Sequence, residues 1–259
     1  MTVPTGAWQR DWIRRHGGAP DSVVAVRYVQ TPSVFGDLRI STARPDVSHA
    51  ASFADLSDDE LAALARQDGF AGTTSVDGAN ATWHHEIDFQ PAGDAADIGR
   101  IERAGDAAMF EHALDDSYVE RWSAIDRGGG RFFAVRVVRD GRVDQLLAVA
   151  GPQFVYARAR ATPLPAGASI TDAIARTHAS RAQIIAYLDC EISYGSVTGW
   201  RIERSTLPWQ QGKRLALADR IAVDASGQAA PRGATAGEVW SFPVNTLAPA
   251  ELRAVFASP

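Results

Sequence analysis

The segment TWHHEIDFQ at 82–90 places a titratable ring among apolar side chains. Side chains alternate between the two faces of a β-strand, so we expect Trp83, His85, Ile87 and Phe89 on one face. A desolvated imidazole there titrates near neutral pH and can serve as a general acid or base. The alternatives are a buried histidine with a hydrogen-bond partner, or a metal or haem ligand.

A second candidate group lies in VFGDLRIS at 34–41. Phe35, Asp37 and Arg39 share one face of this predicted strand, and the two charged residues are close enough to pair. If the face is exposed, the pair is a surface ion pair of little energetic value. If the face points inward, Arg39 can anchor a carboxylate or an oxyanion.

The third group is DSYVERWSA at 116–124, where Tyr118, Glu120 and Trp122 alternate onto one face. A carboxylate between two large aromatic rings is partly desolvated, which raises its pKa toward the range of a general acid. The alternative is a structural aromatic pair in which Glu120 pairs with an arginine. A carboxylate such as Glu120 within ~4–6 Å of His85 would keep that imidazole protonated.

These three patterns define the predicted site. We expect His85, Tyr118 and Glu120 to be the catalytic residues. The predicted substrate-binding residues are polar and aromatic side chains on the same faces: Tyr28, Phe35, Asp37, Arg39, Trp83 and Trp122.

No metal or cofactor is expected. His84 and His85 are adjacent, so their side chains point to opposite faces of a strand and cannot share a metal. His84, Glu86 and Asp88 are typical of a solvated outer face. The single cysteine, Cys190, excludes an internal disulfide and a cysteine-based zinc site.

The elements that position these residues are mostly strands. VVAVRYVQ and VFGDLRIS are two strands joined by a proline-containing bend. DLSDDELAALARQ at 55–67 has helical periodicity, with Ser57 and Glu60 forming a capping box. The flexible stretch RGGG at 127–130 indicates a boundary between one lobe at 1–126 and another at 131–259.

The two lobes contain similar segments. HEIDF at 85–89 matches CEISY at 190–194, and RIERA at 100–104 matches RIERS at 201–205. This order predicts a diverged tandem duplication. Mostly-β lobes of the size of 1–126 and 131–259 favour closed antiparallel barrels, which have no exposed sheet edges. The fold class is therefore all-β, with two barrel lobes that each carry a short helix.

The first lobe is predicted to hold the functional cavity. Its His85 corresponds in the second lobe to Cys190. Asp37 likewise corresponds to Arg158, so the second lobe lacks the titratable set.

YVQTPSVFGDLRIS, TWHHEIDFQP and YVERW resemble a poorly characterised bacterial family that has a distant fungal branch. Its members are calycin-like, with two lipocalin-like β-barrel lobes. The family pattern has arginine where this chain has His85. The resemblance implies a fold and a cavity but no established activity, so a function has to be argued from the residues.

Composition excludes several functions. The chain has 259 residues, a net charge of −5 and 46% hydrophobic residues, which argues against a nucleic-acid or membrane-surface partner. The sequence has neither a transmembrane segment nor a signal peptide, so we expect a cytoplasmic protein. The expected partner is a small hydrophobic or amphipathic molecule, and a homodimer is compatible with the sequence.

The predicted function is cofactor-independent acid/base catalysis on a small, largely apolar molecule in the first barrel. The reaction would be an isomerisation, a hydration or dehydration, or another lyase reaction. A non-catalytic carrier of a small hydrophobic ligand is the alternative, and a haem- or metal-binding barrel is a third.

Overall fold

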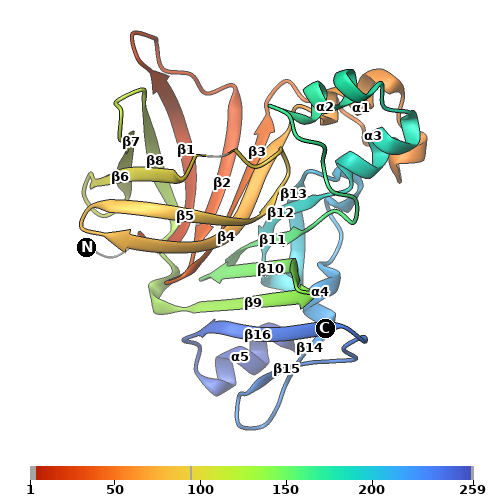
Figure 1. The fold of residues 1–259 in the computed structure, drawn as a ribbon. Coiled ribbons are helices and arrows are strands. Elements are labelled where there is room, and N and C mark those ends of the chain that lie inside the picture. Colours follow the sequence, from red (N-terminus) through yellow and green to blue (C-terminus); the bar gives the residue numbers. More distant parts are fainter. Residues whose placement is uncertain (1–3, 94, 258–259) are drawn as a thin grey trace.

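The computed structural model describes residues 4–93 and 95–257, which are mostly β-structure (Figure 1). The first half is a closed barrel whose eight strands follow one another in chain order, each antiparallel to its neighbours. These strands are β1 (Gly6–Arg15), β2 (Val24–Gln30), β3 (Val34–Ser41), β4 (Asp68–Asp77), β5 (Asn80–Asp88), β6 (Asp97–Arg103), β7 (Ala108–Ala113) and β8 (Tyr118–Asp126). The predicted all-β class and the barrel of the first half are confirmed.

The predicted strand pair and helix of the first half are also present. β2 and β3 pair across the bend, with Tyr28 opposite Asp37. The helix α1 (Asp58–Leu64) is shorter than the predicted range. Its capping box forms as expected, since the backbone N–H of Ser57 donates to Glu60 Oε2 at 2.7 Å.

The second half forms a six-stranded sheet in the order β13-β12-β11-β10-β9-β16, and the small strands β14 and β15 pair separately. The bounds are β9 (Phe132–Arg139), β10 (Arg142–Ala150), β11 (Gln153–Arg158), β12 (Glu191–Ser196), β13 (Arg201–Ser205), β14 (Ile221–Val223), β15 (Ala229–Pro231) and β16 (Glu238–Asn245). The helices are α2 (Ile170–Thr177), α3 (Arg181–Leu188), α4 (Ala216–Asp219) and α5 (Pro249–Phe256). The 3₁₀ turns of the whole chain are η1 (Phe53–Asp55), η2 (Gly128–Gly130), η3 (Thr198–Trp200) and η4 (Pro208–Gln210).

This half departs from the expected second closed barrel with one short helix. Its sheet is open, because β14 and β15 pair only with each other and do not join β13 to β16. One sheet face packs instead on the C-terminal helix, where Phe133 and Trp200 contact Phe256 of α5. This packing removes the apolar face from water without closing a barrel. Residues 184–188, which precede the CEISY segment, belong to α3.

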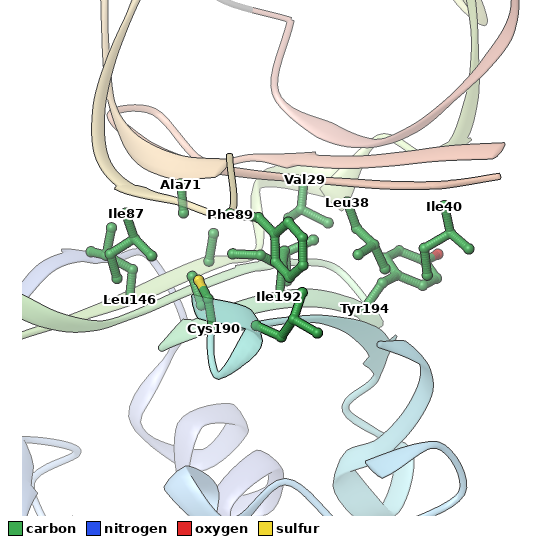
Figure 2. Packing of buried hydrophobic residues seen from close by; sticks show 14 of the residues in the cluster. Val29, Leu38, Ile40, Ala71, Ile87, Phe89, Leu146, Cys190, Ile192 and Tyr194 are labelled. Carbon is green, nitrogen blue, oxygen red and sulfur yellow. The ribbon is translucent and has the colours of Figure 1, made fainter. Parts of the chain in front are cut away.

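The other face of this sheet packs on the outside of the barrel (Figure 2). Barrel residues such as Leu38 and Ile87 meet Leu146, Cys190 and Ile192 in one buried cluster. Cys190 and Ile192 share an apolar face, and that face meets the outside of the barrel.

A β-bulge in β5 changes which side chains face the barrel interior. Ala71 lies opposite Ile87 but Gly72 lies opposite His85, so Glu86 is an extra residue in β5. The expectation that Ile87 shares a face with His85 is therefore wrong. Phe89, which follows the strand, packs with Ile87 on the second sheet instead of inside the barrel.

The predicted lobe boundary coincides with a change of sheet. β8 ends at Asp126 and β9 begins at Phe132, with the η2 turn between them. The division into two domains and the tandem duplication stay predictions. The proposed duplication matches β5 with β12, and it matches β3 with β11 through Asp37 and Arg158. No strand of the second sheet then corresponds to β4, because β12 lies directly beside β11.

Among the described residues, no helix combines the length and the apolar character that crossing a membrane requires.

Candidate functional site

The barrel interior is filled mainly by aromatic side chains. Trp8, Tyr28, Phe35, Trp83 and Trp122 form a buried cluster with the residues Val26, Phe70, Ala81, Ile101 and Met109. They leave a cavity of about 20 Å³. A water molecule needs roughly 10–15 Å³ measured in this way, so the closed space holds one small group.

The cavity wall combines aromatic and charged side chains. It is lined by Tyr28, Asp37, Arg39, Phe70, Trp83, Asp97, Met109, Glu111 and Trp122. The side chain of Asp97 is 34% exposed and that of Arg39 is 26% exposed, so the cavity lies close to solvent at their end of the barrel.

Asp37 and Arg39 face inward and pair with each other, as their spacing on one strand predicted. Arg39 donates from Nε and Nη2 to the two carboxylate oxygens of Asp37, each at 3.0 Å. The guanidinium also lies 4.7 Å from the ring centre of Phe70. Because Asp37 occupies both donors of this fork, Arg39 offers less to a carboxylate than the sequence suggested.

Glu111 is the buried acid of the cavity wall. Tyr118 donates its hydroxyl to Glu111 Oε1 at 3.0 Å. Burial, together with the nearby carboxylates of Glu120 and Asp97, raises the pKa of Glu111 to about 8. The carboxyl group is therefore mostly protonated at pH 7.

His85 is held between two carboxylates at the edge of the site. Its Nδ1 lies 2.6 Å from Asp88 Oδ1, and its Nε2 lies 3.1 Å from Asp97 Oδ2. The ring stacks on Phe70 with the centres 4.1 Å apart. Burial alone would lower the pKa of His85, but the hydrogen bonds that its ring donates to the two aspartates raise it to about 9. His85 is therefore an imidazolium at neutral pH, paired with these aspartates rather than with Glu120.

Glu120 points inward and forms an ion pair with Arg10, which is the structural alternative considered for it. Its Oε2 atom is buried and has no hydrogen-bond partner among the described residues. The same is true of the Trp122 indole nitrogen. Trp83, in contrast, donates its indole N–H to the Tyr28 hydroxyl at 2.9 Å. Of these two residues, Trp122 lines the cavity, so its indole N–H is free to contact a ligand there.

The structure brings most of the predicted site residues together. Five of them line the cavity, namely Tyr28, Asp37, Arg39, Trp83 and Trp122. Phe35 is buried and packs edge-on against Phe70, and Tyr118 reaches the site through Glu111. His84, as expected, lies on the exposed outer face, where Ser75 is its hydrogen-bond partner.

Sequence reasoning missed Glu111, Asp97 and Arg10 as members of the inward-facing set. The signal for Glu111 was available, since AMFEHA at 108–113 alternates Met109, Glu111 and Ala113 onto one face. Among the described residues, no group of three or more His, Cys, Asp or Glu side chains is arranged to hold a metal ion.

Eight antiparallel strands that follow one another around a closed barrel are the lipocalin arrangement. The first half is a lipocalin-like barrel. The sequence matches no protein-family model and no curated protein. A structural comparison finds a lipocalin-like protein from Bacteroides uniformis at 12% sequence identity, with a TM-score of 0.32. The match covers 47% of this chain and 98% of that protein.

Proposed function

We propose that the lipocalin-like barrel is an acid/base site for a small, largely apolar organic molecule. The reaction class is an isomerisation, a hydration or dehydration, or another lyase reaction, without an organic cofactor. The observation that supports this most directly is Glu111, a buried carboxyl group that lines the cavity and has a pKa of about 8.

Proton transfer is most efficient when the pKa of the catalytic group lies near the working pH. Glu111 meets this condition, because near pH 8 it can both donate and accept a proton. Tyr118 orients the carboxyl group through its hydrogen bond to Oε1. Burial raises the pKa of Tyr118 itself, so the hydroxyl stays protonated and serves as a donor.

The other charged groups act on Glu111 or on the substrate. Glu120 lies opposite Glu111 on the neighbouring strand, and its carboxylate helps to keep Glu111 protonated. Arg39 and the imidazolium of His85 lie near the solvent-facing end, each paired with aspartate carboxylates, and the imidazolium can donate a proton to a substrate there. His85 is therefore proposed as an acid and not as a neutral base.

Deuterium exchange tests this proposal without knowledge of the substrate. A thermal-shift screen first identifies small molecules that bind; a ligand at 100 times its Kd adds about 2.7 kcal/mol to the free energy of unfolding. Each binder is then incubated with the protein in D₂O and analysed by NMR. We expect the substrate to gain deuterium at carbon with the wild-type protein and to lose at least about 90% of that exchange rate with Glu111→Gln, since general acid/base groups contribute ~10²–10⁴-fold.

Glu102→Gln is the matched control. This residue belongs to β6, is 56% exposed and hydrogen-bonds to His112 on the outside of the barrel. Binding without any deuterium incorporation would support the carrier function that lipocalin-like barrels also serve. Full exchange by Glu111→Gln would contradict the assigned role of Glu111.

A further inference from the structure

The cavity has the composition of a site for a positively charged group. Four aromatic rings line it: Tyr28, Phe70, Trp83 and Trp122. The ring faces of such residues carry partial negative charge and attract ammonium groups. Three carboxyl groups and a single cation, Arg39, complete the charged part of the wall.

The positive charges near the cavity are already paired. Arg39 uses two donors on Asp37. The imidazolium of His85 lies between Asp88 and Asp97, so one positive charge faces two negative ones. Beyond the cavity wall, Glu120 is paired with Arg10. The groups around the cavity therefore carry an excess of negative charge, which would repel a carboxylate or phosphate.

We propose that the barrel cavity binds the ammonium head of a small amine, with the aromatic rings and the carboxyl groups of Glu111 and Asp97 around it. This inference rests on the proposed function and names the substrate class of the same site. The head group enters the small cavity, and the rest of the molecule lies at the end where Asp97 and Arg39 are partly exposed.

The unpartnered indole N–H of Trp122 adds a second requirement. This donor is buried, and Trp122 lines the cavity, so a ligand with an acceptor oxygen near its ammonium group would satisfy it. An amino alcohol carries both groups. Ethanolamine is therefore the probe, with ethylene glycol as its neutral counterpart and glycolate as its anionic counterpart.

Binding of a cation is coupled to the protonation of Glu111. The groups that face Glu111 are Glu120 and Tyr118 from β8, Asp97 from β6 and Arg39 from β3. An added positive charge within ~4–6 Å lowers the pKa of a carboxyl group by about 1–3 units. By linkage, each unit by which the bound cation lowers the pKa of Glu111 strengthens binding to the ionised form about tenfold. Ethanolamine affinity therefore rises with pH and levels off above pH 8.

The test is an NMR titration that follows the tryptophan indole N–H resonances between pH 6 and about pH 9, where an alkylamine stays protonated. For the wild-type protein we expect ethanolamine to bind at least about tenfold more tightly than ethylene glycol at pH 8, and glycolate not to bind. Glu111→Gln should remove the rise of affinity with pH, whereas Glu102→Gln should retain it.

Equal affinity for ethanolamine and ethylene glycol would overturn the inference, and so would tighter binding of glycolate. The wild-type pH dependence needs no variant, so the test stands even if Glu111→Gln fails to fold. Deuterium incorporation into a neutral or anionic compound would uphold the proposed function while refuting the amine as its substrate. Tight ethanolamine binding without deuterium exchange into any compound would uphold the amine as the ligand while refuting the proposed acid/base function.

Discussion

Two carboxylic acids on neighbouring strands, Glu111 and Glu120, face each other inside the barrel and are treated differently by their surroundings. Glu120 has Arg10 as a charged partner, whereas Glu111 has the hydroxyl of Tyr118. Two buried negative charges on directly opposite residues repel each other, so the proton resides on Glu111, which has no cationic partner. The acid of the proposed site is thus defined by the position of one arginine.

The sequence predicted the inward direction of Glu120 because Tyr118 and Trp122 flank it with clear alternation. It could not assign the proton to Glu111, because that depends on Arg10, which lies 110 positions away from Glu120. The partners of His85 were missed for a similar reason, since Asp97 belongs to the next strand and Asp88 reaches the ring only across the bulge.

The charge of His85 gives a prediction at the same scale. Its folded pKa of about 9 lies above the ordinary value of 6.5, so its stabilising contribution is complete below pH 6.5 and is lost as the pH rises through 9. The expected loss, reduced by solvent screening of the partly exposed ring, is on the order of 2–3 kcal/mol. Imidazole NMR should show one titration near pH 9 that is absent in His85→Gln. Asp88→Asn should move this titration toward neutral pH; an unchanged midpoint would contradict the paired geometry.

At the scale of single elements, the bulge in β5 decides which side chains enter the barrel. Trp83 and His85 precede the extra residue Glu86 and face inward, whereas Ile87 follows it and faces the second sheet. Regular alternation was the basis of the sequence prediction, and HHEIDF contains no glycine or proline that marks an irregularity. A pattern of period two cannot reveal where its own register shifts.

Gly72 on β4 allows the bulge to form. A Cβ atom at this position would lie 1.9 Å from the carbonyl oxygen of His84 and 3.1 Å from the nitrogen of Glu86. We therefore expect Gly72→Ala to lower the free energy of unfolding by at least about 1–3 kcal/mol, measured by chemical denaturation. Gly93→Ala is the control, since an added Cβ atom there meets nothing within 4 Å. Equal stability of the two variants would argue against the bulge.

At the scale of the whole molecule, the barrel and the open sheet are held together by close backbone approach and by specific polar contacts. Arg136 of β9 donates to both carboxylate oxygens of Glu86, with the shortest distance 2.7 Å. Arg160 donates to the carbonyl oxygens of Asp88 and Phe89. The second half therefore contacts the backbone that carries Asp88, the partner of His85.

At Gly36 the barrel and the open sheet approach each other closely. Its added Cβ atom would lie 2.4 Å from Val155 Cγ1. Gly36→Ala should therefore cost about 1–3 kcal/mol of stability. Shortening the opposing side chain makes room, so the double variant with Val155→Ala should be more stable than the sum of the single effects by at least ~0.5 kcal/mol. If the effects of the two substitutions on the free energy of unfolding simply add, the two residues do not touch.

The sequence predicted two closed barrels, of which the structure contains the first, but not how the halves share their apolar faces. Cys190 and Ile192 share one apolar face, and a closed second barrel was the simplest way to bury such a face. The barrel of the first half covers this face instead. A single apolar face does not specify its partner, so this arrangement could not be read from local periodicity.

The bulge in β5 also limits how this gene can change over evolutionary time. Losing the codon of Glu86 would remove the bulge and leave His85 inside the barrel and Ile87 on the interface, whereas losing the codon of His84 would turn His85 away from the barrel. Loss of a codon between Trp83 and His85 should therefore be purged, whereas the exposed turn around Gly105 can lengthen or shorten freely. A homologue that keeps both sheets should keep the spacing between Trp83 and His85 even where its residues differ.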